Sequence, residues 1–192
     1  MARTNAHRSE HRRRPRAGLA ARLVTVRVFL ARASAAVTGL AALASCAGGV
    51  ADGGTYAATI AGQRFSLVVS CSDPTRQRGL GGVREIAADG GMIFVFPDCR
   101  MRGFWMKDCL TDMDIVYLDA LGYVTAVHTM RIEPPKRADE TDFAYEERLP
   151  RYSSVLPSQF VIELRPGRAA ELGLRTQQKV ELDRDALVAA AR

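Results

Sequence analysis

The sequence predicts an α+β fold: a single compact β-rich domain with a curved sheet or barrel and a few short helices. About seven short apolar segments are separated by turns rich in Gly and Asp, which is typical of strands. Capping signals for helices occur only around short stretches. Residues 46–192 number 147, enough for one hydrophobic core and not comfortably for two. Together these features favour one small domain in which strands dominate.

The first predicted elements are two strands separated by a short helix. Phe65–Val69 is an apolar run of strand length. Asp73 followed by Pro74 is typical of an N-cap with proline at the first helical position, and the glycines from Gly79 onward should end that helix. After the next glycine turn, Met92–Phe96 is continuously apolar, which predicts a strand buried on both faces.

The later elements follow the same pattern. A short helix from Arg168 should end at Gly173, and Asp183 could cap a last helix that reaches Ala191. Further strands are predicted at Gly103–Lys107, Asp114–Leu118, Tyr123–Thr129, Phe160–Leu164 and Lys179–Leu182.

Glu133–Ser158 interrupts this pattern with four prolines, two tyrosines and many charges. A connection of this length in a compact domain is usually functional or disordered. We interpret it either as a lid or docking surface, or as a solvated charged loop. Asp142–Arg148 could form one or two helical turns within it.

The first 45 residues have the build of a secretory signal, with an arginine-rich region before an apolar run, Ala33–Ser45. As a helix this run is about 20 Å long, too short to span a hydrocarbon core of about 30 Å. The segment Leu43-Ala44-Ser45-Cys46 resembles a bacterial lipoprotein signal. We therefore expect export, cleavage before Cys46 and lipid on Cys46 that anchors the protein to a membrane. An ordinary signal peptide is the alternative.

The predicted organisation is a signal peptide at 1–45, a flexible tether at 46–55 and the β-rich domain at 56–192. The expected location is the periplasmic face of the cell envelope, and Ala47 after the cysteine favours the outer membrane by the same resemblance. Residues 1–45 hold nine Arg and one Glu, so the remainder has 18 basic and 20 acidic residues and a formal charge of −2. A nucleic-acid partner is therefore not expected.

Four motifs between Phe65 and Leu182 resemble the bacterial and archaeal family known as domain of unknown function 192. The most specific is Phe104-Trp105-Met106-Lys107, followed by Asp114-Ile115 and Leu118-Asp119. The other three are Asp73-Pro74 leading to Arg78-Gly79-Leu80, Gly90–Phe96, and Val161-Ile162-Glu163-Leu164 before Gly167.

The chain departs from the family pattern at two places. Asp108-Cys109 stands where members usually carry Asn-Thr, and Gly81 replaces a common methionine. If these positions line a shared pocket, the ligand of this chain differs. The resemblance implies a compact β-rich domain of unassigned activity, often exported, and it supplies no catalytic residues.

The candidate ligand-binding residues cluster around the most specific motif. Trp105 beside Met106 could form the floor of a pocket, with the Lys107 ammonium placed to hold an anionic ligand. Asp108 adjoins them, and Asp114 opens an apolar strand where a buried carboxylate needs a partner. The structural alternatives are a core role for Trp105, an exposed Lys107 and a hydrogen-bonding role for Asp114.

These residues lead to three hypotheses. The first is a lipoprotein whose domain binds a small molecule or an envelope protein without catalysis and without a cofactor or metal. The second is an envelope hydrolase or transferase that uses Asp114 with Lys107. The third is a redox or copper module in which Cys99 and Cys109 could form a disulfide, or could bind Cu(I) together with Met101, Met106 and Met113.

Overall fold

The structure is a computed structural model that describes residues 49–191. The predicted signal peptide and the predicted lipidation site Cys46 lie outside the described residues. Within 49–191, none of the helices has the length and apolar character needed to cross a bilayer.

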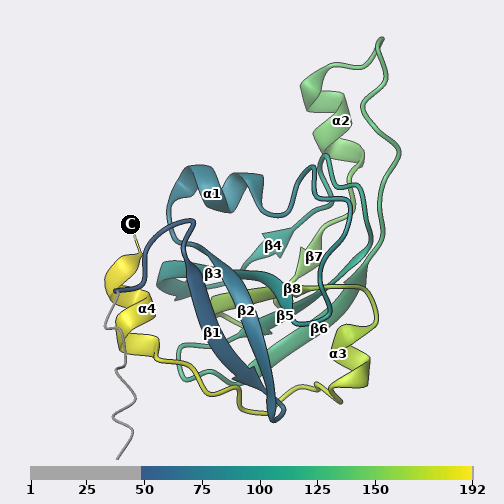
Figure 1. The fold of residues 1–192 in the computed structure, drawn as a ribbon. Coiled ribbons are helices and arrows are strands. Elements are labelled where there is room, and N and C mark those ends of the chain that lie inside the picture. Colours follow the sequence, from purple (N-terminus) through teal and green to yellow (C-terminus); the bar gives the residue numbers. More distant parts are fainter. Residues whose placement is uncertain (1–48, 192) are drawn as a thin grey trace, which may run out of the picture. The chain divides into compact units, whose positions relative to one another are not determined.

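Short strands dominate the described part of the chain, and the helices are short (Figure 1). The strands are β1 (Thr55–Ile60), β2 (Gln63–Ser70), β3 (Gly90–Arg100), β4 (Gly103–Phe104), β5 (Met113–Leu118), β6 (Val124–Met130), β7 (Tyr152–Ser153) and β8 (Ser158–Leu164). The helices are α1 (Asp73–Arg78), α2 (Asp142–Arg148), α3 (Arg168–Glu171) and α4 (Arg184–Ala190). The predicted α+β, β-rich class is confirmed.

Six of the strands form one mixed sheet in the order β1-β2-β3-β8-β5-β6. Only the β2–β3 pair is parallel, and α1 lies in the crossover that connects these two strands. The predicted strand Lys179–Leu182 is reduced to two isolated bridges, Thr59 with Glu181 on one edge of the sheet and Tyr123 with Lys179 on the other. The sheet is therefore strongly curved but not closed.

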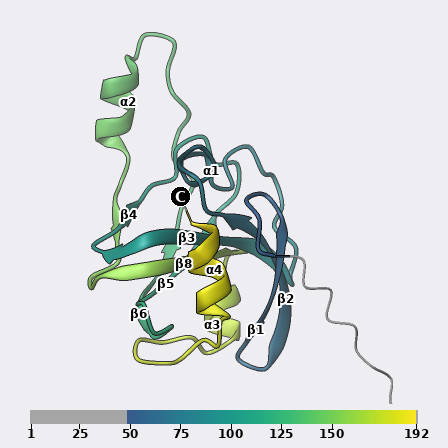
Figure 2. The same cartoon turned by 90° about the vertical axis from the view of Figure 1, so that its left-hand side faces the viewer.

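The sheet has two apolar faces because side chains alternate along its buried strands. On β3, Ile93 and Val95 belong to one core cluster, whereas Met92 and Phe94 belong to a second cluster. The first cluster includes residues of α3 and α4, and the second adjoins the segments that follow α1 and β4. Figures 1 and 2 show α3 and α4 on one side of the sheet and α1 on the other. We call these the first face and the second face.

The predicted strand Gly103–Lys107 is shortened to the two residues of β4, which pair only with β7. The chain turns immediately afterwards: Cys109 N donates to Met106 O, and Asp108 has φ of 56°. The long connection between β6 and β8 contains α2, whose first turn is capped by Thr141 Oγ1, which accepts from Ala144 N. In both views the arm that carries α2 extends away from the sheet.

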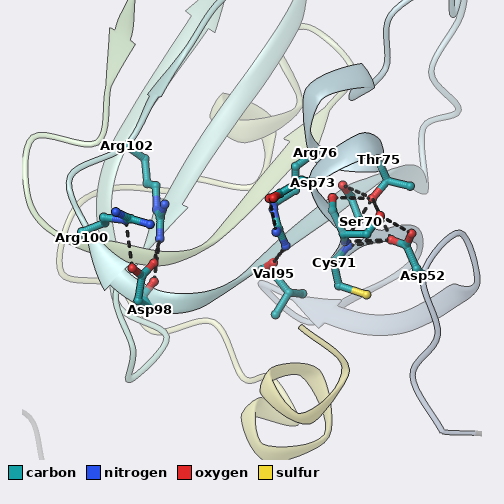
Figure 3. Close-up of polar contacts among 11 residues, drawn as sticks. Asp52, Ser70, Cys71, Asp73, Thr75, Arg76, Val95, Asp98, Arg100 and Arg102 are labelled. Carbon is teal, nitrogen blue, oxygen red and sulfur yellow. Dashed lines mark hydrogen bonds and ion pairs between the residues drawn. The ribbon is translucent and has the colours of Figure 1, made fainter. Parts of the chain in front are cut away.

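The last part of the predicted tether is bound to the domain. The Asp52 carboxylate accepts hydrogen bonds from the backbone of Cys71 and from the hydroxyls of Ser72 and Thr75, at 2.6–2.8 Å (Figure 3). Burial alone would raise the pKa of Asp52, but these hydrogen bonds outweigh it and hold the pKa well below its ordinary value. Asp52 therefore fixes the start of the domain to the N-terminal end of α1.

Candidate functional site

A groove of about 1120 Å³ opens on the second face. One wall is α1 with the glycine loop Gly79–Gly82 that follows it. Residues 101–109, without Met106, form the opposite wall, and Glu146 and Arg151 of the arm add to it. This volume is sufficient for a small organic ligand.

A buried acid lines the groove. Glu163 on β8 is only 4% exposed, and its Oε2 has no hydrogen-bond partner within residues 49–191. Desolvation raises the pKa of Glu163 to about 8, although a backbone hydrogen bond from Leu80 acts in the opposite direction. At neutral pH the carboxyl is therefore mainly protonated and is a hydrogen-bond donor beside the groove.

The glycine loop lies close against this acid. Gly79 has φ of 52°, a conformation that side-chain-bearing residues rarely adopt. A Cβ atom at this position would lie 3.3 Å from Phe94 Cζ and 3.7 Å from Glu163 Oε2. A larger residue would therefore crowd the part of the groove next to the carboxyl.

Aromatic rings line much of the groove. Phe104 contacts Phe94 and Phe96 edge to face, with ring centroids 4.9 and 6.4 Å apart. Trp105 is half-buried, and the Arg151 guanidinium stacks on its ring at 3.5 Å from the centroid. The groove thus offers flat apolar surfaces beside cationic groups.

Two largely buried arginines flank Phe96 in the groove. The Arg102 guanidinium lies 3.8 Å and that of Arg76 lies 5.2 Å from the ring centroid. Figure 3 shows their partners: Arg102 pairs with Asp98, and Arg76 pairs with Asp73 and donates to Val95 O at 2.9 Å. These guanidiniums are held in place by the protein itself.

The arm docks on the rim of the groove through α2. Lys107 Nζ lies 2.5 Å from Glu146 Oε1, and this hydrogen bond and ion pair raises the pKa of Lys107. The buried Tyr145 hydroxyl lies 3.3 Å from Asp108 N and 3.5 Å from Asp108 Oδ1. The second half of the predicted lid or docking segment is therefore part of the wall of the site.

The structure brings together three of the five predicted ligand-binding residues. Trp105, Lys107 and Asp108 line the groove. Met106 does not: it is 1% exposed and packs in the core cluster of the second face. The predicted role of Met106 in the binding surface is wrong because the turn after β4 points this side chain into the core.

Asp114 is the second correction. Its neighbours on the same side of β5, Val116 and Leu118, belong to the core of the first face, and Asp114 itself is 1% exposed. Its carboxylate accepts from Thr129 Oγ1 and from Ala169 N in α3, each at 2.8 Å. Asp114 therefore ties α3 to the sheet and does not line the groove.

The acid–base hypothesis required Asp114 and Lys107 to meet in one pocket. Lys107 lines the groove on the second face, whereas Asp114 is hydrogen-bonded to α3 on the first face. Both Asp114 oxygens already accept hydrogen bonds, and the Lys107 ammonium pairs with Glu146. The structure does not bring this pair together.

The cysteine prediction also requires correction. Cys99 and Cys109 are free thiols, so the disulfide that the third hypothesis allowed between them is not formed. Cys99 is exposed on β3, whereas Cys109 is half-buried against the core of the second face. Burial, together with the nearby Glu163 and Asp108, raises the pKa of the Cys109 thiol to about 12.

Metal binding has limited support from the described residues. Residues 49–191 contain no group of three or more His, Cys, Asp and Glu side chains that could hold a metal ion. Among the proposed soft ligands, Met106 and Met113 are fully buried in the core, and Met101 is exposed. Copper binding stays a prediction.

Sequence reasoning missed several residues of the site, among them Glu163 and Arg151. Glu163 was noted only as part of a motif, but a glutamate between Ile162 and Leu164 in a buried strand is a signal for a functional acid. Arg151 lies just beyond α2 in the arm, and no sequence pattern connects it to Trp105.

Comparisons with known proteins identify a family for this chain and a solved structure that shares its fold. A family model described as DUF192, Uncharacterized ACR, matches residues 56–182. A comparison with curated proteins gives no match. A solved protein of unknown function from Novosphingobium aromaticivorans DSM 12444 is 24% identical, with a TM-score of 0.52 over 67% of this chain and 85% of that one. A structure from Sinorhizobium meliloti 1021, described as a candidate transcription regulator, is 26% identical, with a TM-score of 0.49 over 66% and 90%.

Proposed function

The chain belongs to the DUF192 family of uncharacterised proteins, and from this premise we propose that its domain is a non-catalytic module that binds a small organic ligand in the groove of the second face. The observation that supports this proposal is the buried Glu163 carboxyl, whose Oε2 has no partner within residues 49–191. A buried polar atom without a partner is costly, and a ligand that accepts its hydrogen bond removes that cost.

The lining of the groove favours a ligand with a flat ring. Trp105, Phe96 and Phe104 offer aromatic surface, and Arg151 already stacks on Trp105. A ring could pack against these side chains while one of its substituents reaches Glu163. Apolar surfaces with a few converging polar groups are typical of small-molecule sites.

Binding is a better explanation of this groove than the acid–base chemistry predicted as its alternative. Lys107 is paired with Glu146, and Asp114 lies on the other face. The Cys109 thiol, with a pKa of about 12, is a poor nucleophile at neutral pH.

The proposed place of action is the cell envelope. Support comes from the sequence alone, because the lipoprotein-type signal ending at Cys46 would give the chain a lipid anchor on the exported side of a membrane. Membrane fractionation and intact mass of the protein from its native cells test this part. An uncleaved and unacylated chain in the cytosol would contradict it.

The groove is tested with ring probes on the purified full chain. Benzyl alcohol and benzoate are titrated in ligand-observed NMR against wild type, Trp105→Ala and Phe143→Ala. Phe143 is a matched aromatic control, since it is 75% exposed on α2 and does not line the groove.

We expect at least one probe to bind, Trp105→Ala to weaken its binding about tenfold, and Phe143→Ala to leave it unchanged. No binding of either probe, or equal binding by Trp105→Ala, would overturn the proposal.

A further inference from the structure

The charged side chains that line the groove differ in whether the protein supplies them with a hydrogen-bond or ion-pair partner. Each of its three carboxylates near the rim has a donor: Asp73 has Arg76, Asp108 has the Tyr145 hydroxyl, and Glu146 has Lys107. These carboxylates are therefore already neutralised or hydrogen-bonded by the protein.

Two guanidiniums that line the same groove have no carboxylate partner within residues 49–191. Within residues 49–191, Arg78 at the end of α1 makes neither a hydrogen bond nor an ion pair through its side chain. Arg151 contacts the Trp105 ring and likewise has no carboxylate partner in that range. Both are exposed, so their N–H donors point to solvent or to a bound molecule.

From this asymmetry we infer that the ligand of the groove is a ring compound that carries an oxyanion, a carboxylate or a phosphate, which Arg151 and Arg78 recognise. This inference rests on the proposed function and specifies its ligand class. The Lys107 ammonium, which the sequence suggested for this role, is paired with Glu146 and contributes less.

The stacking of Arg151 on Trp105 explains how one ligand could use both the aromatic surface and the charge. A guanidinium held over an indole ring keeps its edge N–H groups available in a fixed plane. A ring that packs beside Trp105 therefore brings its carboxylate or phosphate to the edge of the Arg151 guanidinium, where two parallel hydrogen bonds can form.

A cation is a less suitable ligand. Arg78 and Arg151 would repel it, and the rim carboxylates are occupied by protein donors. Glu163 is the remaining acid, and its burial favours the neutral form, which donates a hydrogen bond to an oxyanion instead of attracting a cation.

The test compares four probes that share one ring and differ in charge: benzoate, phenyl phosphate, benzyl alcohol and benzylamine. Their dissociation constants are measured with the full chain at pH 7 and low salt. Wild type is compared with Arg151→Gln, Arg78→Gln and the control Arg175→Gln. Arg175 is exposed, does not line the groove, and its substitution changes net charge by the same amount.

We expect benzoate or phenyl phosphate to bind about tenfold more tightly than benzyl alcohol, and benzylamine to bind most weakly. Comparison of the two anions distinguishes a carboxylate site from a phosphate site. Arg151→Gln should remove most of the preference for the anion, Arg78→Gln should reduce it, and Arg175→Gln should retain it.

The possible failures are distinguishable. If benzyl alcohol, benzylamine and the anions bind equally, or if Arg175→Gln has the same effect as Arg151→Gln, the oxyanion inference is wrong while ring binding stands. If no probe binds, the proposed function itself fails. Circular dichroism of each variant establishes that these exposed substitutions leave the fold unchanged.

Discussion

Replacement of Glu163 by glutamine should change how the stability of the protein depends on pH. Glu163 is buried, and desolvation raises its pKa from the ordinary value of 4.5 to about 8. An unfolded chain would ionise this group near 4.5, so folding takes up a proton between these two values. The stabilisation that depends on the neutral acid is complete below pH 4.5. It decreases steadily as the pH rises from 4.5 to 8 and is lost above pH 8.

The magnitude follows from the difference between the two pKa values. Each pH unit between 4.5 and 8 lowers the unfolding free energy of wild type by about 1.4 kcal/mol relative to a chain without this titration. Between pH 5 and pH 7, Glu163→Gln should therefore become more stable relative to wild type by about 2–3 kcal/mol. Glutamine keeps a donor and the shape of the side chain, so it isolates the effect of ionisation.

The measurement is urea denaturation of wild type and Glu163→Gln from pH 5 to pH 9. The control is Glu147→Gln, an exposed position on α2 that has no ion pair within residues 49–191. We expect the unfolding free energy of Glu163→Gln, relative to that of wild type, to increase up to about pH 8 and then to level off. The control should show no such trend. A difference that stays constant across this range would refute the account of a neutral buried acid.

Three further predictions concern other parts of the structure. Asp52→Ala removes a carboxylate that accepts hydrogen bonds from Cys71, Ser72 and Thr75, and it should lower the unfolding free energy by about 1–3 kcal/mol in urea denaturation. Asp114→Ala should destabilise folding by about 2 kcal/mol or more while the dissociation constants of the ring probes stay unchanged, because Asp114 lies on the first face. Iodoacetamide at pH 8 should modify Cys99 much faster than Cys109, as followed by peptide mass spectrometry, because the Cys109 thiol stays protonated.

Much of the fold could be predicted because its elements are specified locally. The continuous apolar run of β3 predicted a strand buried on both faces, and Asp73-Pro74 predicted the start of α1. The prediction failed where pairing is decided by distant segments. Lys179–Leu182 has the composition of a strand, yet it makes only one bridge to each sheet edge. No local pattern contains that information.

The candidate site was only partly predictable for a similar reason. Trp105, Lys107 and Asp108 could be grouped because they are neighbours in sequence, and the structure places them in the same wall. Met106 lies between them and points into the core, because successive residues around a turn face different directions. Glu163 and Arg151 come from β8 and from the arm, and only the tertiary structure brings them to the groove.

The two faces of the sheet differ in how they are covered. The first face is covered by α3 and α4, and its polar residue Asp114 has both oxygens satisfied by the protein. The second face carries α1, the loops that follow α1 and β4, and the arm, and these leave open the groove next to one unsatisfied acid.

Beneath the groove, the core of the second face contains four methionines, Met92, Met106, Met113 and Met130. Methionine side chains are flexible and adapt to changes of shape above them. Substitutions of groove residues should therefore alter ligand preference at little cost in stability, whereas substitutions on the first face should do the reverse.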